Sequence, residues 1–134
     1  MQYAQKNVKY LTFNINYLSG LDGTVYDYYN GYEDLKNHKI AFVGEPSQRI
    51  QEDYLRILRY FRFYGRLSLD PDNHDQDTLK AISSNISGLK NISGERIWSE
   101  LNKILIGSHS CELMKKMLHL GIGPFIGKFF FILI

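Results

Sequence analysis

Cysteine and proline are both scarce in this sequence, which holds one cysteine and three prolines among its 134 residues. The single cysteine, Cys111, excludes an internal disulfide bond, which argues against a disulfide-stabilised secreted domain and favours a reducing compartment. A zinc site is not supported either, because Cys111, His109 and His119 lack the paired-cysteine spacing of such sites. A packing role is the stronger interpretation of Cys111.

The sequence also lacks a long hydrophobic run. Residues 129–134 form a run of six large apolar residues, whereas a helix that crosses a bilayer needs about 20. Residues 1–6 have neither the apolar stretch of a signal peptide nor the arginine-rich character of a mitochondrial presequence. We therefore expect an intracellular protein without a targeting segment or a membrane partner, located in the mitochondrion, the cytoplasm or the nucleus.

A strong charge of either sign is absent as well. The formal net charge is +2, which slightly favours a polyanionic partner but falls well short of a dedicated basic arm. Ten tyrosines and eight phenylalanines suggest surfaces that combine apolar packing with hydrogen bonding or base stacking. Composition is therefore compatible with RNA contact without establishing it.

The first third of the chain has the pattern of an incomplete sheet. Residues 24–29 are rich in β-formers and follow an Asp22-Gly23 turn signal, and residues 39–43 are a candidate for a short buried strand. Residues 33–36 form one helical turn in this interpretation. Because two or three strands rarely stand alone in water, the sheet needs further partners.

The remainder of the chain is predicted to be helical, which makes the fold class α+β. A long amphipathic helix is expected from Pro46 to about Tyr64, with Gly65 as its stop. Three further helices are expected at about residues 75–86, 94–106 and 111–120, with Asp75 and Ser93 as N-terminal caps. The last of them should bury Met114, Met117 and Leu118 and end at residues 121–124.

Four polar residues share one face of the first predicted helix. At about 100° per residue, Arg49, Asp53, Arg56 and Tyr60 fall in one stripe beside the apolar face. An aspartate accepts hydrogen bonds and an arginine donates them from a rigid fork, so Asp53 and Arg56 could match the edge of a nucleobase. Periodicity alone favours a simpler interpretation, an exposed ion pair on a helix.

Two Asp-x-Asp triplets, at residues 70–72 and 75–77, are not expected to hold a metal ion. A calcium loop that begins at Asp70 would place Asp75 where glycine is needed and Ala81 where a bidentate glutamate is needed. A capping role for these acidic residues is the stronger interpretation.

Three segments carry a more specific pattern: Glu52-Asp53-x-x-Arg56 with Leu58-Arg59-x-x-Arg62-Phe63, then the stretches at residues 27–35 and 93–101. The first resembles the nucleotide-selecting motif of the CCA-adding tRNA nucleotidyltransferases of class II, the bacterial and eukaryotic type. The other two resemble the hinge motif and the neck-helix motif of the same family. The resemblance covers about residues 11–127 and is nearest to the mitochondrial-type eukaryotic enzymes.

The resemblance implies a template role for two side chains. Asp53 and Arg56 would form Watson–Crick-like hydrogen bonds with CTP and then ATP while CCA is added to tRNA, with Mg²⁺ as cofactor and without DNA as a partner. Arg59 and Arg62 would help to neutralise triphosphate or tRNA backbone, and a solvated helix face is the alternative. Hinge or support roles are implied for Asp27, Gly31, Asp34, Glu95 and Arg96.

The sequence departs from the family near its beginning. Leu11-Thr12-Phe13-Asn14 is present, but Val8-Lys9-Tyr10 stands where the family has an Arg-Arg-Asp triplet that contacts the nucleotide. The glycine-rich strand and the metal-binding Asp-x-Asp pair do not occur before residue 11. Because phosphoryl transfer depends on positioning and metal charge, we expect no catalytic or metal-binding residue here and no activity from the chain alone.

Three regions follow from this comparison of motifs. Residues 1–44 are predicted to be the C-terminal remnant of the nucleotidyltransferase head, residues 45–127 the helical neck and start of the body, and residues 128–134 an apolar tail unlike the family. The chain is then a CCA-adding enzyme truncated at both ends. Two alternatives stay open, a non-catalytic helical module that binds RNA or protein, and a fragment that does not fold stably alone.

Overall fold

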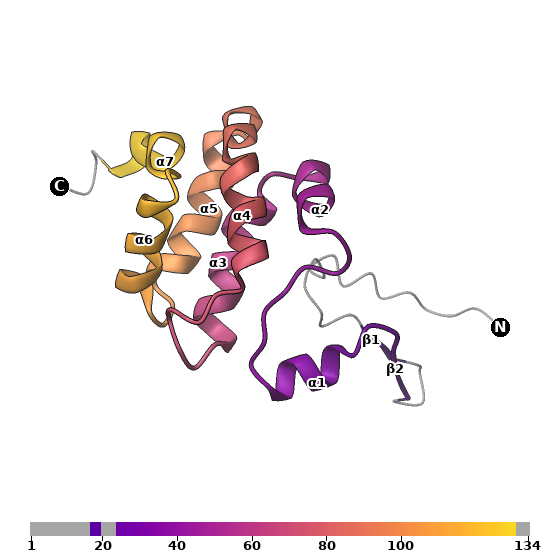
Figure 1. The fold of residues 1–134 in the computed structure, drawn as a ribbon. Coiled ribbons are helices and arrows are strands. Elements are labelled where there is room, and N and C mark those ends of the chain that lie inside the picture. The colour runs from indigo at the N-terminus through magenta and orange to yellow at the C-terminus, as the bar shows by residue number, and fades with distance from the viewer. Residues whose placement is uncertain (1–16, 20–23, 131–134) are drawn as a thin grey trace.

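The computed structural model describes residues 17–19 and 24–130, in which a small hairpin precedes a set of helices (Figure 1). Strand β1 (Tyr17–Ser19) pairs antiparallel with β2 (Val25–Asp27), and Tyr17 lies opposite Asp27. The helices follow in the order α1 (Gly31–Lys36), α2 (Pro46–Glu52), α3 (Arg56–Leu67), α4 (Gln76–Asn85), the 3₁₀ helix η1 (Ile86–Asn91), α5 (Gly94–Leu105), α6 (Ser110–His119) and α7 (Gly123–Phe130). The α+β prediction is confirmed, with β1, β2 and α1 to one side of helices α3 to α7.

The predicted sheet is smaller than expected within the described residues. Residues 24–29 contribute only β2, and the Asp22-Gly23 turn signal lies outside the described residues. The predicted strand at residues 39–43 is wrong, because only Phe42 makes an isolated bridge there. Ile40 and Phe42 are buried in the hydrophobic core instead, and Phe42 stacks on Tyr60 with ring centroids 6.0 Å apart.

The single long helix predicted from Pro46 to Tyr64 is also wrong, because the chain breaks at Asp53. This residue has extended backbone angles, φ −157° and ψ 104°, between α2 and α3. Its carboxylate accepts a hydrogen bond from the Leu55 N–H at 3.2 Å, and its carbonyl accepts one from the Arg56 N–H at 3.0 Å. A short polar side chain that bonds to nearby backbone in this way competes with helical hydrogen bonds.

A contact between Tyr54 and η1 accompanies the break at Asp53. Tyr54 lies directly against Gly88 of η1, where a Cβ atom would stand 2.0 Å from a Tyr54 ring carbon. Gly65, predicted to stop the helix, lies inside α3 instead. Its missing side chain lets Leu113 and the Ser108 carbonyl approach, both 2.8 Å from where a Cβ would be. Both glycines serve close packing rather than a turn.

The later helices match the prediction at their N-termini. The Asp75 carboxylate accepts hydrogen bonds from the Thr78 N–H and hydroxyl, both at 2.8 Å, and these bonds lower the pKa of Asp75. The Ser93 hydroxyl accepts from the Arg96 N–H at 3.4 Å. The expected break after α6 occurs at Gly121, whose φ is +84°, and α7 follows it without having been predicted.

The burial pattern of α6 differs from the prediction at one residue. Met114 and Met117 are buried as expected, whereas Leu118 is half exposed and Leu113 takes the inward position.

The hydrophobic core centres on α3, which packs against α5, while α4 packs against α2. The largest fully buried side chains of the core include Ile57, Leu58, Tyr60, Phe61, Ile82, Leu89, Leu101 and Ile104. Within the described residues, no helix has the length and apolarity needed to span a membrane.

A buried histidine joins the loop before α4 to this core. The His74 ring stacks on Tyr64 with centroids 3.8 Å apart, and its Nδ1 lies 2.9 Å from the Tyr60 hydroxyl. Burial lowers the pKa of His74 to about 4, and nearby Lys116 acts in the same direction. His74 is therefore a neutral packing residue at physiological pH.

Candidate functional site

The candidate site is the junction between α2 and α3, where Asp53 ends one helix and Arg56 begins the next. The α2 helix starts at Pro46, a residue suited to the first helical turn, and the Glu45 side chain accepts a hydrogen bond from the Ser47 N–H at 3.3 Å. The α3 helix then carries its apolar face into the core. Asp53 and Arg56 are thus placed by a turn between two helices rather than by periodicity along one.

Asp53 is held from α5. Its carboxylate oxygens lie 3.3 and 3.5 Å from Nη2 of Arg96, and the same group accepts the Leu55 N–H. The Asp53 side chain is 26% exposed and the Arg96 side chain 50% exposed, so the pair lies at the surface. Arg96 was expected only as a support residue, and the structure brings its guanidinium to Asp53.

Arg56 is held from α2. Its Nη1 donates to the Arg49 carbonyl at 2.6 Å and to the Glu52 carboxylate, which also accepts Arg49 Nη1 at 2.8 Å. These bonds lower the pKa of Glu52, with the Arg56 hydrogen bond as the largest cause. The Arg56 side chain is 18% exposed. One carboxylate thus gathers two guanidinium groups beside Asp53.

Arg59 and Arg62 point to a buried acid on α5. Nη1 of Arg62 lies 2.8 Å from Oε2 of Glu100, and the Arg59 Nε lies 4.0 Å from Oε1 of the same residue. The Arg62 and Glu100 side chains are only 5% and 6% exposed. The alternative of a solvated face is wrong for Arg62, while nucleotide contact by Arg59 and Arg62 stays a prediction.

The predicted hinge residues organise α1. The Asp27 carboxylate accepts the backbone N–H groups of Tyr32 and Gly31 at 2.8 Å and of Tyr29 at 3.3 Å, and these bonds lower the pKa of Asp27. Asp34 faces Lys39 at 4.0 Å. Glu95 is exposed in the first turn of α5, near the positive end of the helix. Their hinge and support roles stay predictions.

The described residues do not fit a Mg²⁺ site. Among residues 17–19 and 24–130, no group of three or more His, Cys, Asp or Glu side chains could hold a metal ion. The members of the two Asp-x-Asp triplets serve other contacts: Asp72 pairs with Lys116, Asp75 caps α4 and Asp77 pairs with Lys80.

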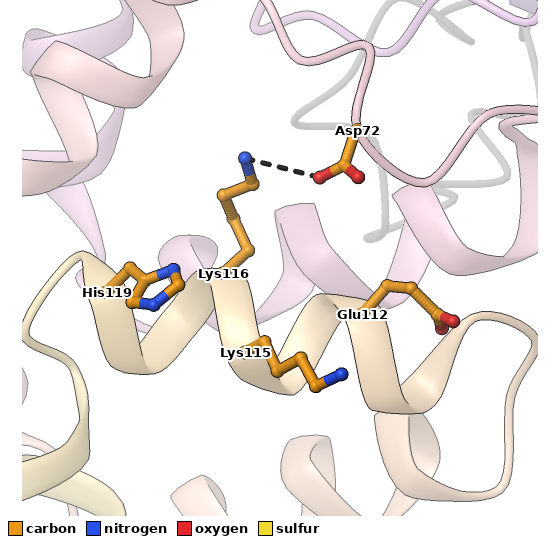
Figure 2. A pocket seen from close by; sticks show the side chains of 5 residues that line it. All are labelled: Asp72, Glu112, Lys115, Lys116 and His119. Carbon is orange, nitrogen blue, oxygen red and sulfur yellow. Dashed lines mark ion pairs between the residues drawn. The ribbon is translucent and has the colours of Figure 1, made fainter.

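A shallow hollow of about 350 Å³ lies on α6, away from the α2–α3 junction. Figure 2 shows its lining side chains and the ion pair of 3.3 Å between Lys116 and Asp72. The complete lining is Asp72, Glu112, Lys115, Lys116 and His119. Neither Asp53 nor Arg56 contributes to it.

The comparisons with known proteins cover nearly the whole chain. Residues 74–129 match a family described as the probable RNA and SrmB-binding site of polymerase A. Over 117 residues, 87% of its length, the chain is 60% identical to the human protein named CCA tRNA nucleotidyltransferase 1, mitochondrial. Over 92% of its length it is 38% identical to the CCA-adding enzyme of Staphylococcus epidermidis.

A solved structure gives the same result for the fold. The CCA-adding enzyme of Bacillus stearothermophilus in complex with CTP superposes with a TM-score of 0.77 and 30% identity over 88% of this chain. The chain belongs to the CCA-adding tRNA nucleotidyltransferase family. It spans 27% of the human relative, 31% of the staphylococcal relative and 29% of the solved structure's chain.

The Val8-Lys9-Tyr10 and Leu11–Asn14 segments lie outside the described residues. Among the described ones, the motif comparison did not single out Glu100, which organises Arg59 and Arg62. A signal for Glu100 existed, because it falls on the inward stripe of α5 between Ile97 and Ile104.

Proposed function

We propose that this chain supplies the base-reading part of a CCA-adding tRNA nucleotidyltransferase, with Asp53 and Arg56 as the groups that select CTP and then ATP. The observation that carries the proposal is their geometry. An acceptor-only carboxylate and a donor-only guanidinium stand at one helix junction, three residues apart and partly exposed. Magnesium, tRNA and the two nucleotides are the cofactor and partners that this function requires of the complete enzyme.

The chemistry of the bases explains why this pair of groups suits cytosine and adenine. Both present an amino donor beside a ring nitrogen that accepts a hydrogen bond. Asp53 can accept from the amino group while Arg56 donates to the ring nitrogen. Uracil and guanine present a carbonyl and a ring N–H at the corresponding positions, which reverses the polarity and leaves both protein groups unmatched.

The domain division is part of the same proposal. In this division residues 1–44 belong to the head, residues 45–127 to the neck and the start of the body, and residues 128–134 to an apolar tail unlike the family. The separate position of β1, β2 and α1 supports a boundary near Gly44, whose positive φ of +78° marks a turn. Asp27 and Gly31 would then set the start of α1 at a hinge between head and neck.

A second candidate function is RNA binding by the helical region without base selection. The family match over residues 74–129, described as a probable RNA-binding site, favours it. Lys115, Lys116 and His119 on α6 give that region basic groups at one hollow (Figure 2). The two functions are compatible, because base selection would use the α2–α3 junction and RNA contact would use α6.

Replacing Asp53 by alanine separates the two candidates. We expect Asp53→Ala to weaken binding of CTP and ATP by about tenfold or more, because a hydrogen bond to a charged group is worth about 1.5–3 kcal/mol. Calorimetric titration of the purified chain measures this change. Asp77→Ala on α4 removes the same group from an exposed ion pair with Lys80 and should leave nucleotide binding unchanged.

Filter binding with tRNA completes this test. Under the proposed function, tRNA binding persists in Asp53→Ala while nucleotide binding falls. Nucleotide binding that does not respond to Asp53→Ala, together with intact tRNA binding, would support the non-catalytic module instead.

A further inference from the structure

Both proposed base-reading groups are occupied by partners from the same chain. The Asp53 carboxylate accepts from the Arg96 guanidinium, and Nη1 of Arg56 donates to the Glu52 carboxylate and to the Arg49 carbonyl. Each partner has the hydrogen-bonding polarity that a nucleobase would present. Arg96 stands in for the amino donor of cytosine or adenine, and Glu52 stands in for the ring nitrogen that accepts.

We propose that Arg96 and Glu52 are internal competitors of the nucleobase, so that base binding at this site is an exchange of hydrogen-bond partners. The proposal rests on the proposed function of Asp53 and Arg56. It assigns to Arg96 a direct effect on nucleotide affinity, in addition to any role in supporting the fold. Before a base enters, Asp53 and Arg56 are each paired with a side chain of opposite charge.

The exposure of the two competing pairs makes such an exchange feasible. Arg96 and Glu52 have side chains that are 50% and 40% exposed, so water can solvate them when they are displaced. An exposed ion pair contributes little free energy, so breaking one changes the nucleotide-binding equilibrium by less than about fivefold. The neighbouring Arg62–Glu100 pair is buried and would not exchange at such a small penalty.

The position of Arg96 is fixed by the helix that carries it. Arg96 and Glu100 lie one turn apart on α5, and Glu100 holds that helix against α3 through Arg62. The Arg96 guanidinium therefore reaches the junction from an anchored helix, while only its flexible side chain needs to move. A residue in this position can release Asp53 without a change in the packing of α3 and α5.

A competing role and a purely supporting role of Arg96 predict opposite effects on CTP affinity when Arg96 is replaced. If Arg96 competes with the base, Arg96→Met should raise the affinity for CTP by about two- to fivefold, because Asp53 is then free to pair. Calorimetric titration of the purified chain with CTP gives this value. Lys80→Met, which removes a lysine charge from an exposed pair on α4, should not raise it.

Two further variants make the test decisive. Glu52→Gln weakens the second competing pair and should also raise CTP affinity, whereas Arg96→Met should have no effect in an Asp53→Ala background. Reduced or unchanged CTP affinity in Arg96→Met, with Asp53→Ala still impaired, overturns the competition and leaves the proposed function standing. No effect of Asp53→Ala alone overturns both.

Discussion

Replacing Glu100 by alanine is expected to lower the free energy of unfolding by about 3–5 kcal/mol, because it leaves the buried Arg62 guanidinium without its carboxylate. Arg59 and Lys103 also lie within 4.0 Å of Glu100, so three positive side chains would lose a shared negative partner. The unfolding transition in urea, followed by circular dichroism, measures the change.

Two variants control this prediction. Glu95→Ala removes an exposed glutamate from the same helix and should change the free energy of unfolding by less than about 0.5 kcal/mol. Replacing Glu100 and Arg62 together by methionine should recover most of the lost stability, because the buried guanidinium is then removed and the partly exposed Arg59 and Lys103 side chains can be solvated. A loss below about 1 kcal/mol in Glu100→Ala would show that the pair is not a buried charge pair.

Gly88→Ala is expected to lower the free energy of unfolding by about 1–3 kcal/mol and to weaken CTP binding as well. A Cβ at this position would lie 2.0 Å from a ring carbon of Tyr54, so the ring must move. Tyr54 follows Asp53 directly in the turn between α2 and α3, and its displacement would move the Asp53 carboxylate. Urea unfolding and titration with CTP measure the two effects.

The contact with Tyr54 can be isolated by a double-mutant cycle. In a Tyr54→Ala background the effect of Gly88→Ala should largely disappear, because the ring that meets the new methyl group is gone. Gly127→Ala on α7 is the matched control, since nothing lies within 4 Å of its Cβ position. An equal loss from Gly88→Ala in both backgrounds would place its cause elsewhere.

The helix caps and most inward stripes could be predicted from the sequence because their determinants are local. Asp75 and Ser93 bond to backbone groups three residues away, and the apolar spacing in α5 is regular. The break at Asp53 could not be predicted in this way. Apolar spacing continues across it from Ile50 to Ile57, and the contact that accompanies the break comes from Gly88, far along the chain.

The same difference between local patterns and long-range contacts applies to the candidate site. The residue types and spacing of Asp53 and Arg56 indicated a nucleobase-matching pair, but spacing does not reveal which partners those groups have in the folded chain. Arg96 reaches Asp53 from 43 residues away, and Glu100 reaches Arg62 from 38 residues away. Contacts at that separation follow from the packing of α3 on α5, which a single sequence does not specify.

The most direct test of the base-reading pair is the ratio of CTP to UTP affinity in the wild-type chain and in Asp53→Asn. An asparagine amide can donate to the uracil carbonyl that the Asp53 carboxylate repels. We expect the wild-type chain to prefer CTP and Asp53→Asn to reduce that preference by about tenfold. Equal affinities in the wild type, or a ratio that the substitution leaves unchanged, would contradict the role of Asp53 in reading the base.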